Sequence, residues 1–306
     1  MERKSKAEVE GFLKILPPVE FACIYGSSLH PNNQDKSTMT DYILGVADPL
    51  QWHSENLKLN KNHYASWMVH LGGARLITEV ADDIGVGVHF NPFVTWNGKM
   101  FKYGVVRMHD LIHDVLYWER FYFSGRLQKP VYVVVDNLDI QNINSVNLRS
   151  AVSAALLLLP SEFTEVKKIV RGQFDQFHTM YKPFLEEYEA KKLLRFSSAA
   201  NHQIQVFQDC NLSGACSLVS ALPPSIRSQM SMKLGEKTKL NDTGQIVRNV
   251  AISSREEAAK CLQRILRQKV MVSSTRQAVS GLLAVGGVNA TRYLAKKIRK
   301  AWNSWR

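Results

Sequence analysis

A glycine and two serines follow the first apolar segment of the chain. Residues 20–25 are apolar enough for a buried strand, and Gly26, Ser27 and Ser28 come directly after it. A glycine at a strand end lets backbone N–H groups approach an anion, and serine hydroxyls can hold phosphate oxygens. Asp41 begins the next predicted strand, where its carboxylate could hold Mg²⁺ against those phosphates. The turn alone indicates no more than a strand-to-loop connection, but with Asp41 it outlines a nucleotidyl-transfer site.

Two cations occupy a short loop between a glycine and a proline. Gly125 and Pro130 bound a segment that contains Arg126 and Lys129, just before a predicted strand at residues 131–135. Two cations in such a loop would suit a triphosphate. An ordinary solvated loop is an equally good interpretation of this segment in isolation.

A polar stripe has helical spacing. His53, Asn56, Asn60 and His63 step by three, four and three residues, so they share one face of a predicted helix. That face could line a cleft, or it could be a solvated surface.

Other patterns that suggest metal binding are weak. His109 and His113 are four residues apart, with Asp110 and Asp114 beside them. Because no third, distant ligand is evident, a surface turn of a helix is the favoured interpretation. The four cysteines show no C-x-x-C spacing, which argues against structural zinc and fits a reducing compartment.

The segments that must position these residues alternate between strand and helix in the first half of the chain. Apolar stretches predict strands at residues 20–25, 40–46, 85–90, 93–96, 99–105 and 131–135. Helical periodicity predicts helices at residues 49–71, 74–83, 108–121 and 144–159. Asn97 and Gly98 give a strong hairpin signal between two of the strands. We therefore expect an α/β fold with a mixed sheet.

The second half of the chain predicts few strands. Weak strand patterns occur at residues 203–207 and 246–250, and a helix is expected at residues 225–232. Residues 273–289 are rich in Ser and Gly and predict a linker. We expect this half to be mostly helical and small.

Length and composition allow two globular domains. The chain has 306 residues, of which 45% are apolar. No run reaches 18 apolar residues, so a transmembrane helix is not predicted. The segment of residues 1–6 has a net positive charge, but no apolar region follows it. This pattern predicts neither a secretory signal nor a transit peptide.

Most of the excess positive charge lies in the last fifth of the chain. The formal net charge is +12, and residues 258–306 contain eleven Lys or Arg and no Asp or Glu. One side of a helix at residues 289–306 would be apolar, with Leu294, Ile298, Trp302 and Trp305. The opposite side would be basic and include Lys296, Lys297 and Lys300. Such a helix favours an anionic membrane interface. A terminal helix packed on its own domain and a basic arm for nucleic acid are the alternatives.

Six short blocks of sequence resemble a known family. They are Tyr25-Gly26-Ser27-Ser28-Leu29, Asp41-Tyr42-Ile43-Leu44-Gly45-Val46, Trp52-His53-Ser54-Glu55-Asn56, Asn62-His63-Tyr64, Lys102-Tyr103-Gly104-Val105 and Gly125-Arg126-Leu127-Gln128-Lys129-Pro130. In order and spacing these blocks resemble the mitochondrial phosphatidate cytidylyltransferases, which are peripheral CDP-diacylglycerol synthases also described as translocator assembly and maintenance proteins. The likeness runs through residue 165 and resumes from Lys168 to the C-terminus, and the region Asn32–Val135 most resembles plant members.

The resemblance implies an architecture in four parts. These are a nucleotidyltransferase-fold domain at residues 1–165, a mostly helical winged-helix-like domain at residues 166–272, a linker at residues 273–288 and a membrane-interface amphipathic helix at residues 289–306. It also implies a peripheral protein on the matrix side of the mitochondrial inner membrane.

The resemblance implies an activity as well. CMP would pass from CTP to phosphatidic acid with Mg²⁺ as cofactor, giving pyrophosphate and CDP-diacylglycerol for phosphatidylglycerol and cardiolipin synthesis. The catalytic residues would be Asp41, which also holds the metal, Lys129 and Arg126. The substrate-binding residues would be Gly26, Ser27, Ser28, Lys102 and His63, the last as a positioning group. The protein would meet an anionic membrane surface, and no nucleic acid is expected as a partner.

Two departures from expected patterns affect the site. Nucleotidyltransferases usually have a second carboxylate two residues after the first, whereas this chain, like the family, has Ile43 there, so a further carboxylate must come from elsewhere. Family members also have a segment between Glu165 and Val166, with a Ser-Tyr-x-Gly-Asp-x-Arg block, that this chain lacks. An Asp and an Arg are missing with it, which puts the activity of this particular chain in question.

Two other classes of function remain open. A nucleotidyltransferase acting on RNA would use the basic segment for a phosphodiester backbone, although Trp302 and Trp305 favour a membrane. A catalytically impaired, membrane-associated scaffold is the second alternative, because of the missing segment.

Overall fold

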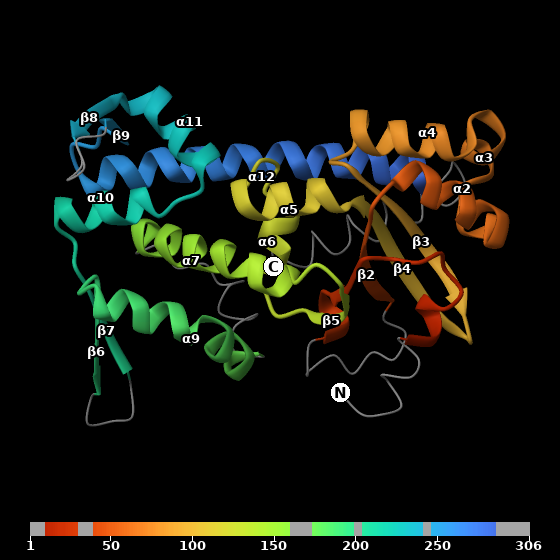
Figure 1. Cartoon of the computed structure of the whole chain (residues 1–306), viewed down its shortest axis with the longest axis horizontal. Helices are drawn as coiled ribbons and strands as arrows, with labels where there is room; N and C mark the ends of the chain where they lie inside the picture. The colour runs from red at the N-terminus through yellow and green to blue at the C-terminus, as the bar shows by residue number, and fades with distance from the viewer. Residues whose placement is uncertain (1–9, 30–38, 160–172, 199–203, 241–245, 286–306) are drawn as a thin grey trace, which may run out of the picture. The chain divides into compact units, whose positions relative to one another are not determined.

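The chain folds into two compact units. The computed structural model describes residues 10–29, 39–159, 173–198, 204–240 and 246–285 (Figure 1). Unit 1 comprises residues 1–112, 131–140 and 271–306, and unit 2 comprises residues 113–130 and 141–270. This division differs from the predicted boundary at residue 165, because residues 113–130 and 141–159 belong with the second half of the chain. Helix α5 (Met108–Tyr117) runs from one unit into the other.

Unit 1 is built on a five-stranded mixed sheet. Its strands are β1 (Phe21–Tyr25), β2 (Thr40–Val46), β3 (Val88–Trp96), β4 (Lys99–Arg107) and β5 (Tyr132–Asp136), in the order β3-β4-β2-β1-β5. Strands β2 and β4 are parallel, and the other neighbouring pairs are antiparallel. The predicted α/β class with a mixed sheet is confirmed.

The β3–β4 hairpin confirms one turn and corrects one strand boundary. Asn97 and Gly98 have φ of 48° and 71°, the left-handed pair that a tight hairpin turn requires. The two strands predicted at residues 85–90 and 93–96 form one strand, whose register shifts between Asn91 and Val94. The irregularity lies at Phe93, with φ of 60°.

One face of the sheet is covered by an apolar cluster. Its members include Phe12, Tyr42, Trp52, Phe101 and Tyr103, and the rings of Phe12 and Phe101 stack with centroids 4.3 Å apart. Successive residues of a strand point to opposite faces. Asp41 and Lys102, the neighbours of Tyr42 and Tyr103, therefore lie on the other face.

The helix predicted at residues 49–71 is divided. Helix α2 (Pro49–Leu59) ends at Asn60, and α3 (Ser66–Leu71) and α4 (Gly73–Glu79) follow after a 3₁₀ turn. The Asn60 side chain donates hydrogen bonds to the carbonyl oxygen of Ile15, at 2.7 Å, and to the side chain of Asn56, at 2.8 Å. These bonds hold Asn60 outside helical geometry, with φ of −138°.

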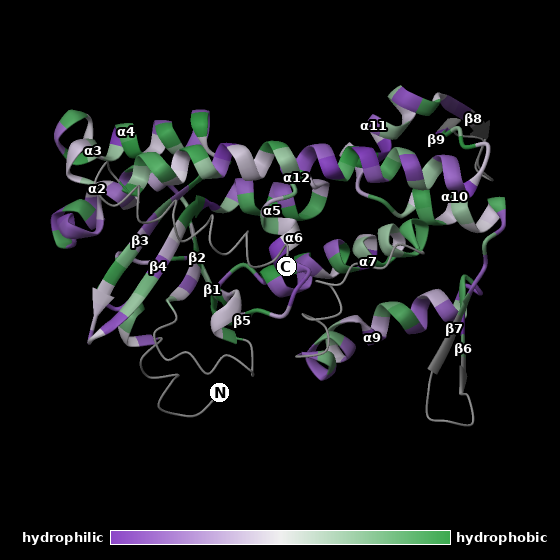
Figure 2. Cartoon of the chain, turned by 180° about the vertical axis from the view of Figure 1, so that it is seen from behind, coloured by the Kyte–Doolittle hydropathy of each residue, from purple (hydrophilic) through white to green (hydrophobic). Residues whose placement is uncertain are grey.

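Unit 2 is mostly helical, as predicted. Its elements after α6 (Phe123–Leu127) are α7 (Ile140–Leu158), α9 (Phe174–Ala190), β6 (Leu194–Ser198), β7 (Ile204–Gln208), α10 (Leu212–Ser220), α11 (Pro224–Leu234), β8 (Glu236–Leu240), β9 (Ile246–Val250) and the part of α12 (Arg255–Val285) up to residue 270. Hydrophobic and hydrophilic residues alternate along α7 and α9, as expected where one face is buried (Figure 2). The two weak strand patterns correspond to β7 and β9, and both pair in hairpins. The winged-helix-like assignment stays a prediction.

The predicted linker is wrong for residues 273–285. They continue helix α12 (Arg255–Val285), and Ser273 and Ser280 are buried in it. The indole N–H of Trp67 donates to the carbonyl oxygen of Leu283 at 3.0 Å, and Arg276 donates to the carbonyl oxygen of Asp83 at 2.7 Å. The small residues here permit close packing within unit 1 and are not a sign of flexibility.

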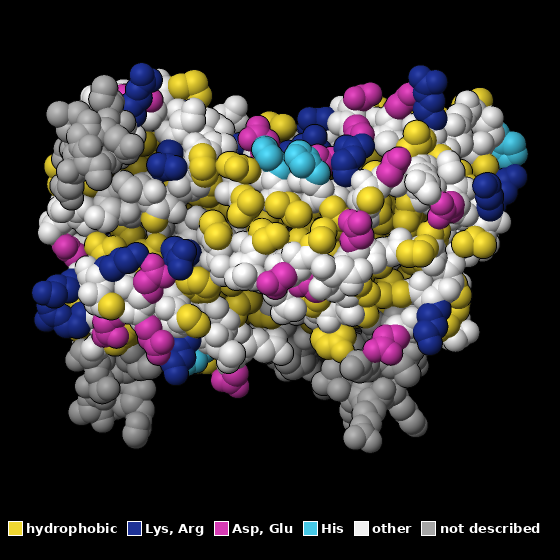
Figure 3. Space-filling view, viewed as in Figure 1, with side chains coloured by type: hydrophobic (Ala, Val, Ile, Leu, Met, Phe, Trp, Pro, Cys, Tyr) yellow, Lys and Arg dark blue, Asp and Glu magenta, His cyan; other side chains and the backbone are white. Residues whose placement is uncertain are grey.

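The predicted membrane helix at residues 289–306 lies outside the described residues. Along the described ranges, no helix is both long and apolar enough to cross a bilayer. On the face drawn in space-filling form, described side chains of both charges are interspersed (Figure 3).

Candidate functional site

The Gly26 turn lies against the carboxylate of Asp41. Gly26 has φ of 89°, and Ser27–Leu29 form a 3₁₀ turn closed by a hydrogen bond from the Leu29 N–H to the Gly26 carbonyl oxygen at 3.2 Å. The antiparallel register pairs Tyr25 with Asp41. A Cβ added at residue 26 would lie 3.4 Å from Asp41 Oδ2. Glycine thus satisfies the backbone angle and leaves room beside the carboxylate.

Lys102 joins this group through the parallel strand pair. The β2–β4 register places Lys102 beside Asp41, and Nζ lies 3.4 Å from Asp41 Oδ1. Nζ also lies 4.4 Å from the centroid of the Phe90 ring. Phe90 can lie there because its partner in the register is Gly104, where any Cβ would meet the ring at 2.4 Å. The structure therefore brings together Gly26, Asp41 and Lys102.

The residues at this turn fit a divalent cation only in part. Ser28 Oγ is buried and has no hydrogen-bond partner in the described structure, so it is an available oxygen ligand. Among the described residues, no group of three or more His, Cys, Asp or Glu could hold a metal ion. Mg²⁺ commonly takes one or two carboxylates and completes its shell with water and substrate phosphates. Asp41 supplies one carboxylate here, so a cation at this turn would need further ligands from water and substrate, and the Mg²⁺ cofactor stays a prediction.

His63 is on the other face of the sheet. Its Nδ1 lies 2.9 Å from the hydroxyl of Tyr103, which belongs to the apolar cluster opposite Asp41. The structure does not bring His63 together with the Gly26 turn.

The polar stripe that contains His63 is part of a buried hydrogen-bond network. The Asn56 amide donates to the hydroxyls of Tyr64 and Tyr103, both at 2.8 Å, and His53 Nδ1 lies 2.9 Å from the Tyr64 hydroxyl. His53 and Asn56 are 1% and 0% exposed, which excludes the solvated-surface interpretation for them. Four members come from outside the stripe and were not predicted: Tyr64 and Tyr103, which accept from Asn56, and His89 and Asn91, whose side chains lie 3.2 Å apart beside the His53 ring.

Burial keeps the histidines of this network neutral. It lowers the pKa of His63 and of His89 to about 4 in each case. Burial, together with the nearby His89, lowers the pKa of His53 well below its usual range. Burial also raises the pKa of the Tyr103 hydroxyl. The network is therefore uncharged at neutral pH.

Arg126 and Lys129 belong to unit 2, after a loop at residues 118–122. The loop predicted between Gly125 and Pro130 is wrong for Arg126, which lies in helix α6, and Lys129 follows two residues after that helix. The Arg126 guanidinium carbon lies 3.5 Å from the centroid of the Tyr122 ring, and Nη1 donates to the Tyr122 carbonyl oxygen at 2.7 Å. The side chain of Lys129 is exposed, and its backbone N–H donates to the Arg126 carbonyl oxygen at 3.1 Å. Lys129 is thus free to meet a solvent-borne anion, whereas the Arg126 guanidinium is engaged with Tyr122.

Asp114 organises this loop, a role that sequence analysis missed. Its buried carboxylate accepts hydrogen bonds from five consecutive backbone N–H groups, those of residues 120–124, at 2.7–3.2 Å. Trp118 and Phe121 have φ of 55° and 52°, a costly conformation for bulky residues. Asn147 accepts from the Trp118 indole N–H at 2.7 Å and donates to the Ser124 carbonyl oxygen at 3.0 Å. These bonds hold the strained loop in one shape.

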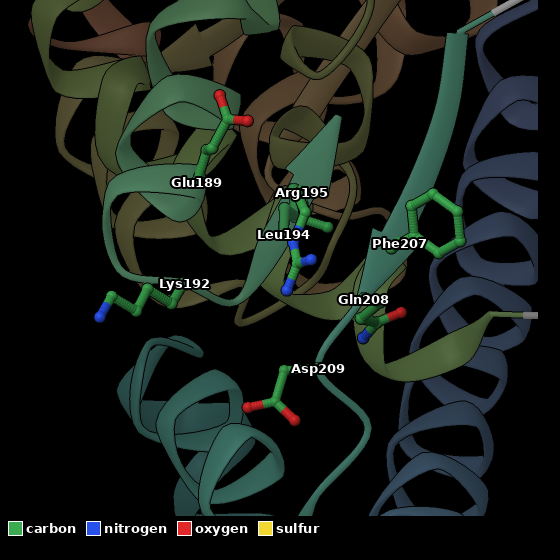
Figure 4. A pocket seen from close by; sticks show the side chains of 7 residues that line it. All are labelled: Glu189, Lys192, Leu194, Arg195, Phe207, Gln208 and Asp209. Carbon is green, nitrogen blue, oxygen red and sulfur yellow. The ribbon is translucent and has the colours of Figure 1, made fainter. Parts of the chain in front are cut away.

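A cavity elsewhere in unit 2 contains none of the predicted site residues. Its volume is about 610 Å³, and its lining residues are Glu189, Lys192, Leu194, Arg195, Phe207, Gln208 and Asp209 (Figure 4). The Arg195 side chain extends toward Asp209, whose carboxylate points away from it, and the Phe207 ring also points away. Two cations and two carboxylates balance, so the cavity offers no net charge for a polyanion.

The mixed sheet with a glycine–serine turn against a strand carboxylate defines a nucleotidyltransferase-like fold in unit 1. The sequence profile of the family "Phosphatidate cytidylyltransferase, mitochondrial" matches residues 9–167 and 164–300. The chain belongs to this family.

Relatives from several lineages match most of the chain. The mitochondrial phosphatidate cytidylyltransferase of Bos taurus is 30% identical over 94% of this chain and 92% of its own. The protein of that name from Mus musculus is 28% identical over the same shares, and that from Schizosaccharomyces pombe is 25% identical over 92% and 80%. The closer likeness to plant members stays a prediction.

The matches also bear on the missing segment. The alignment with the mouse protein is 319 positions long, yet 94% of 306 residues is about 288, so about 31 positions face gaps in this chain. The two stretches matched by the family profile meet at residues 164–167, beside Glu165.

Proposed function

We propose that this protein transfers CMP from CTP to phosphatidic acid, giving CDP-diacylglycerol and pyrophosphate. Family membership supports the substrates. The observation that supports a site in unit 1 is the close approach of the Gly26 turn to Asp41. A Cβ added at residue 26 would lie 3.4 Å from Asp41 Oδ2. The triphosphate would lie at the backbone of Gly26–Ser28, and the Asp41 carboxylate with the Ser28 hydroxyl would hold Mg²⁺.

The nucleophile needs little activation. A phosphate monoester has a second pKa near 6, so phosphatidic acid is already largely anionic at neutral pH. Its phosphate would attack the α-phosphorus of CTP. The bond between that phosphorus and the oxygen that bridges the α- and β-phosphates would break, which releases pyrophosphate. No general base is required, and His63, on the opposite face of the sheet, would act only through packing.

Neutralising clustered negative charge is the main task of the site. Mg²⁺, when bound, would neutralise charge on the triphosphate and on the pyrophosphate. Lys102 from the sheet would contribute an ammonium group. The likeness of residues 125–130 to the family's block supports the same role for Lys129, in the loop after α6. Arg126, stacked on Tyr122, would support the shape of that loop and supply positive charge near Lys129.

The segment absent after Glu165 would complete the site. Asp41 is a single carboxylate, and Ile43 cannot supply a second. We propose that the Asp of the family's Ser-Tyr-x-Gly-Asp-x-Arg block is the further ligand and that its Arg binds phosphate. This chain would then bind CTP more weakly and turn over more slowly than a version with the segment.

We also propose that residues 289–306 hold the protein on the matrix side of the mitochondrial inner membrane, where the product would enter phosphatidylglycerol and cardiolipin synthesis. A lipid leaves the bilayer at a cost of about 0.8 kcal/mol per CH₂, so the enzyme must come to the surface. Each of the six basic side chains in this segment would contribute about 1 kcal/mol of binding free energy at an anionic surface. Insertion of the apolar side chains Leu294, Ile298, Trp302 and Trp305 would add to it.

Removal of residues 289–306 tests the membrane proposal. The truncated protein should leave vesicles rich in anionic lipid but keep more of its activity on detergent-dispersed phosphatidic acid. The double variant Ile298→Glu and Trp302→Glu should also leave the vesicles. Binding as tight as the parent's would identify a purely electrostatic arm instead.

Turnover on vesicles tests the function itself. Radiolabelled CTP, Mg²⁺ and vesicles containing phosphatidic acid should yield labelled CDP-diacylglycerol, with a higher rate when the missing segment is restored. In a parallel reaction with RNA added, label in the RNA but not in lipid would identify the RNA-directed alternative. Vesicle binding without any product from either version would identify a scaffold.

A further inference from the structure

We infer that Lys102 occupies the cation position beside Asp41 in the substrate-free protein, so that a divalent cation binds tightly only together with a nucleoside triphosphate. The competition between Lys102 and the cation follows from the geometry of unit 1. The exchange of Lys102 onto the triphosphate rests on the proposed function.

The sheet fixes the pair at close range. The parallel register of β2 and β4 pairs Asp41 with Lys102, and their charged atoms lie 3.4 Å apart. Both side chains are about four-fifths buried, with exposed fractions of 21% and 19%. Charges that are partly removed from water interact more strongly than exposed ones.

A second contact holds the ammonium in place. Lys102 Nζ lies 4.4 Å from the centroid of the Phe90 ring. The ring can lie under the lysine because residue 104 is glycine, and any side chain there would collide with it. Attraction between the ammonium and the ring face keeps Lys102 on the Asp41 side of the sheet.

The charge balance then opposes a cation that arrives alone. Asp41 and Lys102 sum to zero, and a divalent ion near Asp41 Oδ1 would meet the ammonium as a like charge. A triphosphate at the Gly26 turn would change this balance, because it brings several negative charges. The flexible stem of Lys102 lets the ammonium turn from Asp41 to a phosphate oxygen, which leaves the carboxylate for the cation.

Manganese binding tests the inference without turnover. Binding of Mn²⁺ to the substrate-free protein, followed by electron paramagnetic resonance of the free ion, should be at least tenfold tighter in Lys102→Met than in wild type. Met keeps most of the stem and removes the charge. Lys99→Met, at the exposed start of the same strand, is the matched control and should bind Mn²⁺ like wild type.

Two further arms make the result specific. The double variant Asp41→Asn and Lys102→Met should lose the gain, which assigns the site to Asp41. Addition of CTP should tighten Mn²⁺ binding at least tenfold more in wild type than in Lys102→Met. Circular dichroism should show the same melting transition for the variants, and Lys102→Gln repeats the test if Lys102→Met does not fold.

Equal Mn²⁺ affinities of wild type and Lys102→Met without nucleotide would overturn the competition. Equal tightening by CTP in the two proteins would overturn the exchange. Neither result depends on whether CDP-diacylglycerol is formed, so failure here is distinguishable from failure of the proposed function.

Discussion

In unit 1, Lys102 stands on a strand beside Asp41. In unit 2, Arg126 on the short helix α6 and Lys129 just after it follow a loop that has no backbone ladder. The strand register places Lys102 beside Asp41, and the Phe90 ring holds its ammonium group there. The loop depends on side chains, mainly the Asp114 carboxylate that accepts five backbone N–H groups. A group on a strand is positioned by many repeated bonds, and a group on a loop is positioned by a few that single substitutions can remove.

The two units also differ in the charge of their buried polar groups. The network of unit 1 consists of neutral histidines, tyrosines and asparagines. In unit 2 the buried polar group that holds the loop at residues 118–122 is the Asp114 carboxylate, which is only 2% exposed. Each arrangement should therefore fail under a different perturbation.

The largest expected effect is that of Asp114→Asn on unit 2. The Asn amide N–H₂ would face backbone N–H donors that now meet carboxylate oxygen, and the strained loop at Trp118 and Phe121 would lose its cap. We expect unfolding in urea to show a loss of about 3 kcal/mol or more. Turnover of CTP should fall with it, because Lys129 is no longer held.

Asp110→Asn is the matched control for this prediction. Asp110 lies one turn earlier on α5 and pairs with Arg107 at 3.0 Å near the surface. Its loss should change stability by no more than about 1 kcal/mol. Equal effects of the two substitutions would contradict the role given to Asp114.

The second prediction concerns pH and unit 1. Because the pKa of His89 falls to about 4 on folding, the unfolded chain binds more protons than the folded one between pH 6.5 and pH 4. Stability should therefore decrease as pH falls through this window, by about 3 kcal/mol for His89. Tryptophan fluorescence during urea unfolding at a series of pH values measures the slope of the unfolding free energy against pH.

Substitution of single histidines sharpens the pH test. His89→Gln should flatten the slope, whereas His109→Gln, on the exposed face of α5, should leave it unchanged. A slope that is the same in all three proteins would assign the acid sensitivity to other groups.

The smallest effect is expected for Lys129→Ala. Its side chain is exposed, so stability should be unchanged, but kcat/KM for CTP should fall at least tenfold, or about 1.4 kcal/mol. Lys192→Ala, in the cavity of balanced charge, is the control and should leave the kinetics unchanged. Unchanged kinetics in Lys129→Ala at every CTP concentration would return Lys129 to an ordinary solvated loop.

The strand-borne part of the site could be predicted from sequence because its signals are local. Alternating and apolar stretches locate β1 and β2, and the turn residues Gly26–Ser28 follow the first of them directly. The hairpin at Asn97 and Gly98 was predictable for the same reason. These signals depend on residues next to each other in the chain.

The rest depends on contacts between distant segments. Nothing near Asn60 shows that its side chain meets Ile15 and ends α2 early. Ser273 and Ser280 suggested a linker, yet in α12 they allow close packing. Asp114 was predicted only as a neighbour of His113, because the periodicity at residues 108–121 predicts a continuous helix. That helix instead ends at Tyr117, and residues 120–124 turn their N–H groups back onto Asp114. The sequence could not show that His63 meets Tyr103, on the face of the sheet opposite Asp41, and its substrate-binding role stays a prediction.

The most direct test of the account compares CMP transfer by wild type and Asp41→Asn, both carrying the segment absent after Glu165. Phosphatidic acid vesicles, CTP and Mg²⁺ are the substrates, and labelled CDP-diacylglycerol is the product measured. We expect Asp41→Asn to keep its melting temperature and to retain less than about a tenth of the activity, since losing the ligand removes several kcal/mol of charge stabilisation. A variant that retains more than that would remove Asp41 from the metal site and contradict the account.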